Sequence, residues 1–385
     1  MSRVPLAFSL LLSLCFSAAL AAQQDGTRID FSGLIFANYQ WRTDSTARAA
    51  AAGAGQPANK FDLQRVYLTF RMPAGDRASV RVTTDIFQQA NSPANAFYAG
   101  WAVRLKYAYL QYDFTNSLAG IDGLSATGRL GMLHTVLIDH VDSFWPRWLG
   151  VNSLETHGYF ASADLGVAGL FTMPNRWGEA YVTIVNGNGY TSAETDRFKD
   201  FAGRFSFTPF ANDSGFHRTL AITPWYSRGA TASQFVVVGP GQIAPIAEGL
   251  QRDRRGVFLG LRDRRLTGGI GLSQRIENVE SGANIPLLPR TVRTRTSQLV
   301  DGFAIVRPFE IANPGRRSNF ALIGRFDEFQ LDRDADAKNR FLVLGLIYDI
   351  TSRTSAALDY QELRPMNGSP TTPTQTWFAH FVVNF

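Results

Sequence analysis

The C-terminal segment, residues 375–385, is the feature that most limits what this chain can fold into. Every second side chain is apolar, and in an extended strand these side chains share one face: Trp377, Ala379, Phe381, Val383 and Phe385. In a water-soluble protein, a strand at the end of the chain would have nothing to cover such an apolar face. In a bilayer the face is already solvated, and the backbone can pair with another strand to close a barrel. The segment therefore favours a transmembrane antiparallel β-barrel.

The rest of the chain repeats this two-residue alternation in segments of about ten residues, each bounded by turn residues. We predict an all-β fold of about sixteen strands, near residues 29–41, 60–72, 77–88, 104–114, 127–134, 158–172, 178–187, 198–209, 216–228, 254–263, 266–279, 296–306, 317–330, 338–350, 353–364 and 375–385. Long and short links between these segments mostly alternate, as in barrels with long external loops and short periplasmic turns. The alternative fold, a soluble β-sandwich, would not show this alternation over the whole chain.

The N-terminal residues 1–21 have the pattern of a secretory signal peptide. Arg3 is the only early charge, and residues 6–14 form an apolar run too short to span a bilayer. Ala19-Leu20-Ala21 fits an A-x-A cleavage site, so the mature chain is expected to be a barrel formed by residues 22–385.

Cysteine and charge narrow the class of protein further. Cys15 is the only cysteine and lies inside the signal peptide; Leu14 before it does not fit a lipoprotein signal, which requires a small residue there. The mature chain then has no disulfide and no thiolate metal site, which suits the periplasm. The net charge of +6 comes mostly from arginine. Secretion argues against nucleic acid as the partner, and arginine inside a pore would favour anions.

Three segments assign their two faces clearly, and a fourth does not. Segments 60–72, 77–88 and 254–263 alternate apolar side chains with polar or aromatic ones. A slip of one residue would place arginines in hydrocarbon, so the register is fixed. Segment 338–350 is apolar on both faces, and something other than bulk water must cover its inner face.

Alternation also places a set of arginines on inner faces, where they could form a basic track along the pore. Guanidinium groups stay charged and bind phosphate or carboxylate bidentately. A series of them would pass an anion from site to site without trapping it. The alternative is a solvated wall with compensating charges, since Asp85 and Asp327 lie at similar positions. The candidate pore-lining residues are Arg65, Arg71, Arg81, Arg129, Arg204, Arg262, Arg275 and Arg325.

The third long connection, residues 134–157, is the candidate constriction. Its apolar and aromatic side chains cannot remain solvated outside, so we expect it to fold into the lumen and set the bore. The alternative is an external loop that caps a neighbouring subunit. The residues expected at the constriction are His134, Asp139, His140, Asp142 and Arg147.

Nothing in the sequence predicts an enzyme, a metal site or a cofactor. The histidines in 134–157 have no His-x-x-x-His spacing and no cysteine partner. The run 332–336 resembles the start of a calcium loop, but Ala337 replaces the glycine of the sharp turn and Val343 the closing glutamate. The chain contains no G-x-S-x-G nucleophile elbow.

Several motifs resemble the phosphate-selective porin O and P family: residues 61–68 (FDLQRVYL), 105–112 (LKYAYLQY), 129–132 (RLGM), 186–189 (NGNG) and 199–204 (KDFAGR). The resemblance implies a sixteen-stranded, homotrimeric porin with a basic channel. The ending on Phe385 is similar to the C-terminal signature of Gram-negative outer-membrane proteins, which the barrel-assembly machinery reads.

From sequence we therefore expect a Gram-negative outer-membrane porin, embedded in outer-membrane lipid, for passive diffusion of small hydrophilic solutes with a modest anion preference. The constriction segment 134–157 contains no lysine, so general diffusion is preferred to phosphate specificity. Two alternatives stay open: a substrate-specific channel for phosphate or organic anions, and a non-conducting structural or adhesive barrel.

Overall fold

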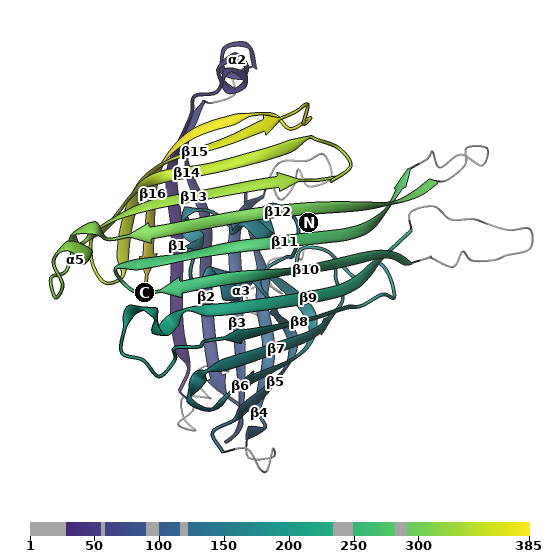
Figure 1. The fold of residues 1–385 in the computed structure, drawn as a ribbon, viewed down its shortest axis with the longest axis vertical. Helices are drawn as coiled ribbons and strands as arrows, with labels where there is room; N and C mark the ends of the chain where they lie inside the picture. Colours follow the sequence, from purple (N-terminus) through teal and green to yellow (C-terminus); the bar gives the residue numbers. More distant parts are fainter. Residues whose placement is uncertain (1–27, 55–57, 90–99, 116–121, 234–248, 282–290) are drawn as a thin grey trace, which may run out of the picture.

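The computed structural model describes residues 28–54, 58–89, 100–115, 122–233, 249–281 and 291–385 (Figure 1). The expected signal peptide, residues 1–21, lies outside these residues. Within them, no helix has the length and apolar character needed to cross a membrane.

The described residues form sixteen antiparallel strands, each paired with the next in sequence, and β1 also pairs with β16, so the sheet is a closed barrel (Figure 1). The strands are β1 Asp30–Arg42, β2 Asn59–Pro73, β3 Ala78–Gln89, β4 Gly100–Asp113, β5 Ser125–His134, β6 Ala163–Thr172, β7 Gly178–Val185, β8 Asp200–Phe207, β9 Ala221–Ala232, β10 Gly249–Arg262, β11 Leu266–Ser281, β12 Thr291–Val306, β13 Phe320–Gln330, β14 Lys338–Asp349, β15 Thr354–Met366 and β16 Thr374–Asn384. The all-β barrel expected from the alternating segments is confirmed.

Short helices occur only between strands in the described residues. They are α2 Ser45–Ala54, α3 Ile138–Asp142, η3 Arg147–Leu149, α4 Ser153–Thr156, η4 Pro174–Arg176, η5 Phe216–Thr219 and α5 Pro308–Ala312. The links β2–β3, β10–β11 and β14–β15 are tight, and α5 lies on the same side of the barrel as they do. We call this end the short-turn side and the opposite end, with α2 and the β5–β6 connection, the long-loop side.

Alternation along the strands separates a wet interior from an apolar exterior. In β13, Phe320, Leu322 and Phe326 are exposed, whereas Ile323 and Arg325 between them are buried. The faces expected for β2, β3 and β10 are also found: Tyr67, Asp85 and Phe258 are buried on the inward positions, whereas Arg71 and Arg262 near the strand ends are exposed. Without a solvent of low polarity, this exterior would be a continuous exposed apolar surface.

The predicted strand ends differ most from the observed ones where a strand extends beyond the apolar part of the barrel exterior, which we call the apolar band. β10 and β12 begin about five residues earlier than the alternation indicated, and with β11 they reach beyond their neighbours in Figure 1. The first residues of β10 and β12 include polar side chains such as Arg252 and Arg293. These two arginines donate to Asp200 and Asp332, respectively, beyond the apolar exterior. β6 begins later, at Ala163, because residues 158–162 belong to the segment that precedes it.

The barrel closes at the seam between β1 and β16, where the C-terminal residue takes part. The backbone N–H of Gly33 donates to the Phe385 carbonyl at 2.7 Å, and that of Phe385 donates to the Gly33 carbonyl at 3.0 Å. The Phe385 ring lies directly over Gly33, so that a Cβ on Gly33 would collide with the ring. It also contacts the Phe31 ring, with centroids 6.1 Å apart.

We therefore expect that deleting Phe385, or replacing it with Ser, lowers the yield of assembled barrel while leaving the conductance of the assembled fraction unchanged. The change removes a lipid-facing aromatic and its cover over the seam. Gly33→Val should produce the same defect from the other strand, because its side chain displaces the ring. The assay is the fraction of heat-modifiable, membrane-inserted protein on gels. Wild-type yields for both variants would contradict this role.

Candidate functional site

Residues 135–162, between β5 and β6, contact the barrel wall at widely separated strands. We call this stretch the inner segment. Its backbone carbonyls accept hydrogen bonds from Arg204 of β8 at Val136 (2.9 Å), from Arg275 of β11 at Gly158 (3.0 Å) and from Gln361 of β15 at Leu149 (3.0 Å). These donors lie on inward-facing positions of strands that are far apart in the sheet order. The inner segment is therefore tied to several parts of the inner wall.

Apolar packing joins the same segment to the wall. Trp145 is 1% exposed, and its ring meets that of Phe303 from β12 at 5.3 Å. One continuous buried cluster contains Leu149 of the segment and Val343 and Ile347 of β14. This cluster explains why β14 is apolar on both faces. Its outer face is part of the apolar exterior of the barrel, and its inner face is covered by the inner segment.

A buried carboxylate fixes the far end of the inner segment to β13. Asp327 has no exposed surface and accepts hydrogen bonds from Arg325 at 2.7 Å and Ser153 at 2.9 Å. His157 lies 3.2 Å away and stacks on Phe329. Arg325 donates in turn to the Val151 carbonyl at 2.6 Å. Arg325 therefore holds the inner segment in place and is neutralised by Asp327.

Asp327→Ala is expected to destabilise the barrel by about 3–5 kcal/mol, because it removes the carboxylate that binds the buried Arg325 guanidinium directly. The matched control is Asp332→Ala, which breaks another Arg–Asp pair, one in which the Arg293 side chain is 58% exposed. Exposed pairs contribute about 0–1 kcal/mol, so the control should change little. The midpoint of thermal unfolding in detergent measures both. Equal shifts would contradict a buried latch at Asp327.

Two of the residues expected at the constriction, Asp142 and Arg147, form an internal ion cluster. Arg147 donates to Asp142 at 3.1 Å and to Glu155 at 2.8 Å, and Asn152 donates to Asp142 at 2.7 Å. Burial opposes the charge of Arg147, but Glu155 and Asp142 hold its pKa well above its usual value. Burial raises the pKa of Asp142 despite the neighbouring Arg147. The cluster joins one arginine to two carboxylates and shapes the segment, so Arg147 is not a free cation.

The other three residues expected at the constriction lie together on the short-turn side of the inner segment. They are His134, Asp139 and His140. His134 is 3.4 Å from Asp139, whose side chain is 60% exposed. His140 shares a hydrogen bond of 3.1 Å with Thr223 of β9, and burial lowers the pKa of its imidazole well below the usual value. The described residues contain no group of three or more His, Cys, Asp or Glu side chains able to hold a metal ion.

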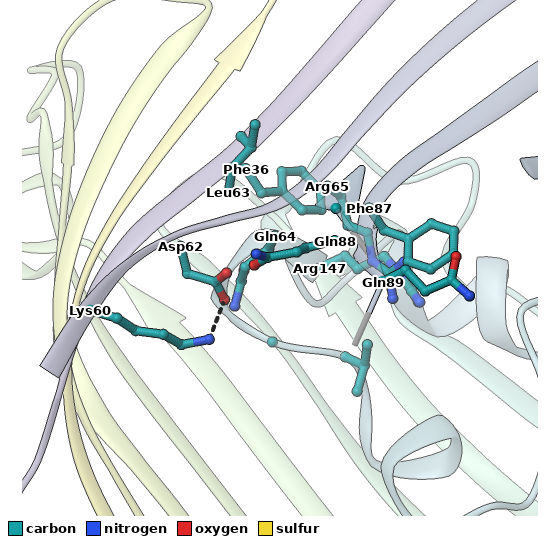
Figure 2. A pocket seen from close by; sticks show the side chains of 13 residues that line it. Phe36, Lys60, Asp62, Leu63, Gln64, Arg65, Phe87, Gln88, Gln89 and Arg147 are labelled. Carbon is teal, nitrogen blue, oxygen red and sulfur yellow. Dashed lines mark ion pairs between the residues drawn. The ribbon is translucent and has the colours of Figure 1, made fainter. Parts of the chain in front are cut away.

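Four cavities follow one another through the barrel, and each shares lining residues with the next. The first, of about 580 Å³, opens among Lys60, Gln64 and Arg147 on the long-loop side (Figure 2). It shares Arg65 with a second cavity of about 540 Å³. Thr135 and Val136 line both this second cavity and a third of about 260 Å³. Arg129 joins the third to a fourth of about 720 Å³ on the short-turn side.

Among the residues that line each cavity, cationic side chains outnumber carboxylates, although Arg65 and Arg147 of the first also bind carboxylates outside its lining. The first is lined by three cationic side chains and one carboxylate, and the second by four and three. The third has three arginines against two carboxylates, and the fourth has five against three. A narrow passage with low-dielectric walls focuses such an excess and raises the local concentration of anions.

The eight arginines expected on the inner face fall into two groups. Four are bound to carboxylates: Arg65 to Asp85, Arg204 to Glu179, Arg275 to Glu277 and Arg325 to Asp327. The other four have no carboxylate partner among the described residues: Arg71, Arg81, Arg129 and Arg262. The alternative of compensating charge therefore describes four of these eight arginines.

Sequence reasoning missed four inward cations of the second cavity and its surroundings. Arg252 and Arg254 of β10 share Asp200 at 3.0 and 3.2 Å, and extending the β10 alternation towards the N-terminus would have found them. Arg104 of β4 binds Asp85 at 2.8 Å, and Lys106 donates to Tyr67 at 3.1 Å. A register shift between β3 and β4 brings both of these side chains inward, and nothing local in the sequence marks it.

No protein-family model matches the chain, and no curated protein matches it. Solved structures do share its fold. Salmonella typhi OmpF, in a complex with daunomycin, aligns with a TM-score of 0.60 at 12% identity over 94% of this chain and 99% of that one. Outer-membrane expressed OmpT of Vibrio cholerae aligns at 0.58 and 9% identity over 93% and 98%. A trimer form of in-vitro folded OmpT aligns at 0.56 and 9% over 93% and 99%. Because the sequence identities are so low, these structural similarities show a shared fold and nothing more.

Proposed function

We propose that the protein is a porin of the Gram-negative outer membrane that lets small hydrophilic solutes diffuse passively, with a modest preference for anions. The observation that carries the proposal is the series of four cavities with shared lining residues, of which the third and fourth are lined in part by arginines that have no carboxylate partner among the described residues. The solved outer-membrane proteins with this fold support the proposed location in the outer membrane. Passive diffusion requires no catalytic group and no cofactor.

The exterior supports insertion of the barrel in lipid. Large apolar side chains are exposed on outward positions of strands all around the wall, for example Val103 at 65%, Ile270 at 58% and Leu344 at 53%. A closed sheet satisfies its own backbone hydrogen bonds, as hydrocarbon demands. The protein would reach this membrane after secretion with residues 1–21 as signal peptide.

The inner segment would act as the constriction of the channel. It takes up lumen space through its contacts with β8, β11, β13 and β15. The smallest of the four cavities, about 260 Å³, lies beside its first residues, Thr135 and Val136. Asp139 and His140 line the same cavity, so they are the side chains that a permeating solute would meet there.

A channel specific for organic anions is the second candidate, and one feature of the second cavity favours it. The Arg104 guanidinium lies 4.0 Å from the centre of the Phe87 ring and 4.7 Å from that of Tyr190. Phe160 and Arg254 line the same cavity, so aromatic and cationic groups alternate there. A current that saturates as the benzoate concentration rises, but not as the chloride concentration rises, would identify a channel that binds organic anions. A current that saturates with phosphate concentration would identify a phosphate-specific channel.

Purified protein in planar bilayers tests the proposed function directly. A porin opens discrete conductance steps that persist without a gradient of any specific solute. A non-conducting structural or adhesive barrel opens no steps under the same conditions, although it is inserted and heat-modifiable. The second result would overturn the proposal.

We also expect a homotrimer. The in-vitro folded OmpT of similar fold was solved in a trimer form. Light scattering in mild detergent should give three times the mass of the chain after subtraction of bound detergent. A monomeric mass at all protein concentrations would contradict the assembly without contradicting the channel.

A further inference from the structure

We propose that the outer wall of the barrel carries a binding site for the phosphate headgroup of a membrane lipid. The site is a groove of about 490 Å³ across β10–β12, at the edge of the apolar exterior that lies toward the long-loop side. The inference rests on the membrane insertion in the proposed function, and it does not depend on conduction. The side chains that line the groove include Arg255, Val257, Leu272, Gln274, Gln298 and Arg333.

The alternation in β10 places Arg255 on the outside of the wall. Arg254 and Phe258 point into the barrel, where they are only 6% and 2% exposed. Arg255 and Leu259 have the opposite parity, and both are exposed. On β11, Leu272 is 50% exposed, and Gln274 follows on the same face. The groove therefore opens toward the surroundings of the barrel and is separate from the four inner cavities.

Strand register places the groove at an edge of the apolar exterior. Arg255 is opposite Gln274, which is opposite Gln298, so three outward polar side chains form one row. The next outward row toward the short turns is entirely apolar, with Val257 opposite Leu272 and Leu272 opposite Val300. A polar row directly beside an apolar row is where lipid headgroups meet acyl chains.

The two arginines at this edge are not neutralised by the protein. Arg255 donates to Gln274 at 2.9 and 2.6 Å and has no carboxylate partner among the described residues. The exposed Arg333 side chain makes no hydrogen bond or ion pair with any described residue. Two other outward arginines differ in this respect: Arg340 binds Glu328 and Arg364 binds Glu362, both at 2.8 Å.

These features together select an amphiphilic anion. Two uncompensated guanidinium groups suit the oxygens of a phosphate, which they bind bidentately, and Gln274 and Gln298 can add neutral hydrogen bonds. Val257 and Leu272 lie where the first methylene groups of an acyl chain would run. A soluble phosphate would satisfy the arginines but would gain nothing from the apolar row. The occupant is therefore a lipid phosphate.

Native mass spectrometry of the detergent-purified protein tests the site. Phosphatidic acid and phosphatidylcholine with identical acyl chains are the probes, and inorganic phosphate is the soluble competitor. We expect phosphatidic acid to be retained in preference to phosphatidylcholine, and Arg255→Gln with Arg333→Gln to reduce that retention by about tenfold. Arg333→Gln alone should give an intermediate loss. The matched control, Arg340→Gln with Arg364→Gln, removes the same charge from the same wall and should retain the lipid.

Equal retention of both lipids, or equal loss in the two double variants, would overturn the site. Binding of inorganic phosphate as tightly as phosphatidic acid would overturn the lipid as its occupant. Bilayer recordings of the same samples separate this inference from the proposed function. A protein that opens no channels but retains phosphatidic acid through Arg255 and Arg333 would support the site and contradict the porin.

Discussion

Replacing residues 137–158 with a short Gly/Ser linker should raise the single-channel conductance several-fold and weaken the discrimination between ions. The replaced stretch carries the internal Arg147 cluster, and it also carries Trp145 and Leu149, which contact β12 and β15 of the wall. Its removal would merge the second and third cavities, which now meet only at Thr135 and Val136. A wider bore also leaves solutes farther from the charged wall, so the field that selects among them is weaker.

The linker variant also uncovers apolar wall residues such as Phe258 and Val343, so its fold must be verified by heat-modifiability. A point variant gives an independent test in the opposite direction. Asp139→Trp places bulk at an exposed position of the smallest cavity and should lower the conductance, whereas Asp139→Asn keeps the size and should not. Unchanged conductance in both the linker and Trp variants would show that the inner segment does not set the bore.

Replacing Arg71, Arg81 and Arg129 with Gln should shift the zero-current potential across a KCl gradient strongly toward cations. These three line the fourth cavity and lack a carboxylate partner among the described residues. Arg129 also lines the third cavity. Their removal leaves Arg28 and Arg77 against three carboxylates in the fourth cavity, so the sign of its charge excess reverses.

The matched control removes three arginines from the outer wall: Arg255, Arg340 and Arg364. This variant has the same net charge as the inner one, but its lost charges do not face the solute path. We expect the wild-type potential from it. If the inner and outer variants shift the potential equally, the cavity arginines do not cause the selectivity.

The barrel was predictable from sequence because the proposed contact of its outer wall with lipid imposes one rule on every strand. Lipid requires an apolar side chain at every second position, and a one-residue error would expose arginines such as Arg81 to hydrocarbon. That constraint ends at the edge of the apolar band, so the true start of β12 at Thr291 was missed. Helices α2 and α5 lie beyond the band, where the two-residue period gives no information.

The electrostatics of the interior were less predictable, because they depend on which strands are neighbours. Alternation alone assigned Arg65 and Arg129 to the same basic track. Asp85 neutralises Arg65 from the adjacent strand, whereas Arg129 donates to the neutral Gln111 and lies beside the rings of Tyr109 and Tyr181. Asp327 and Ser153 are distant in sequence, and only the path of the inner segment brings them together. Side-chain partners across the lumen follow from the folded loop and have no local signature.

The most direct test of the anion-preferring channel is the zero-current potential of the wild-type protein across a KCl gradient, measured at low and at high salt. The Debye length falls from about 10 Å at 0.1 M to about 3 Å at 1 M, so the wall charges should act on passing ions mainly at low salt. We expect a potential of anion-selective sign at low salt that declines toward zero near 1 M. A cation-selective sign at low salt would contradict the account, and would turn attention to Asp139, the exposed carboxylate of the smallest cavity.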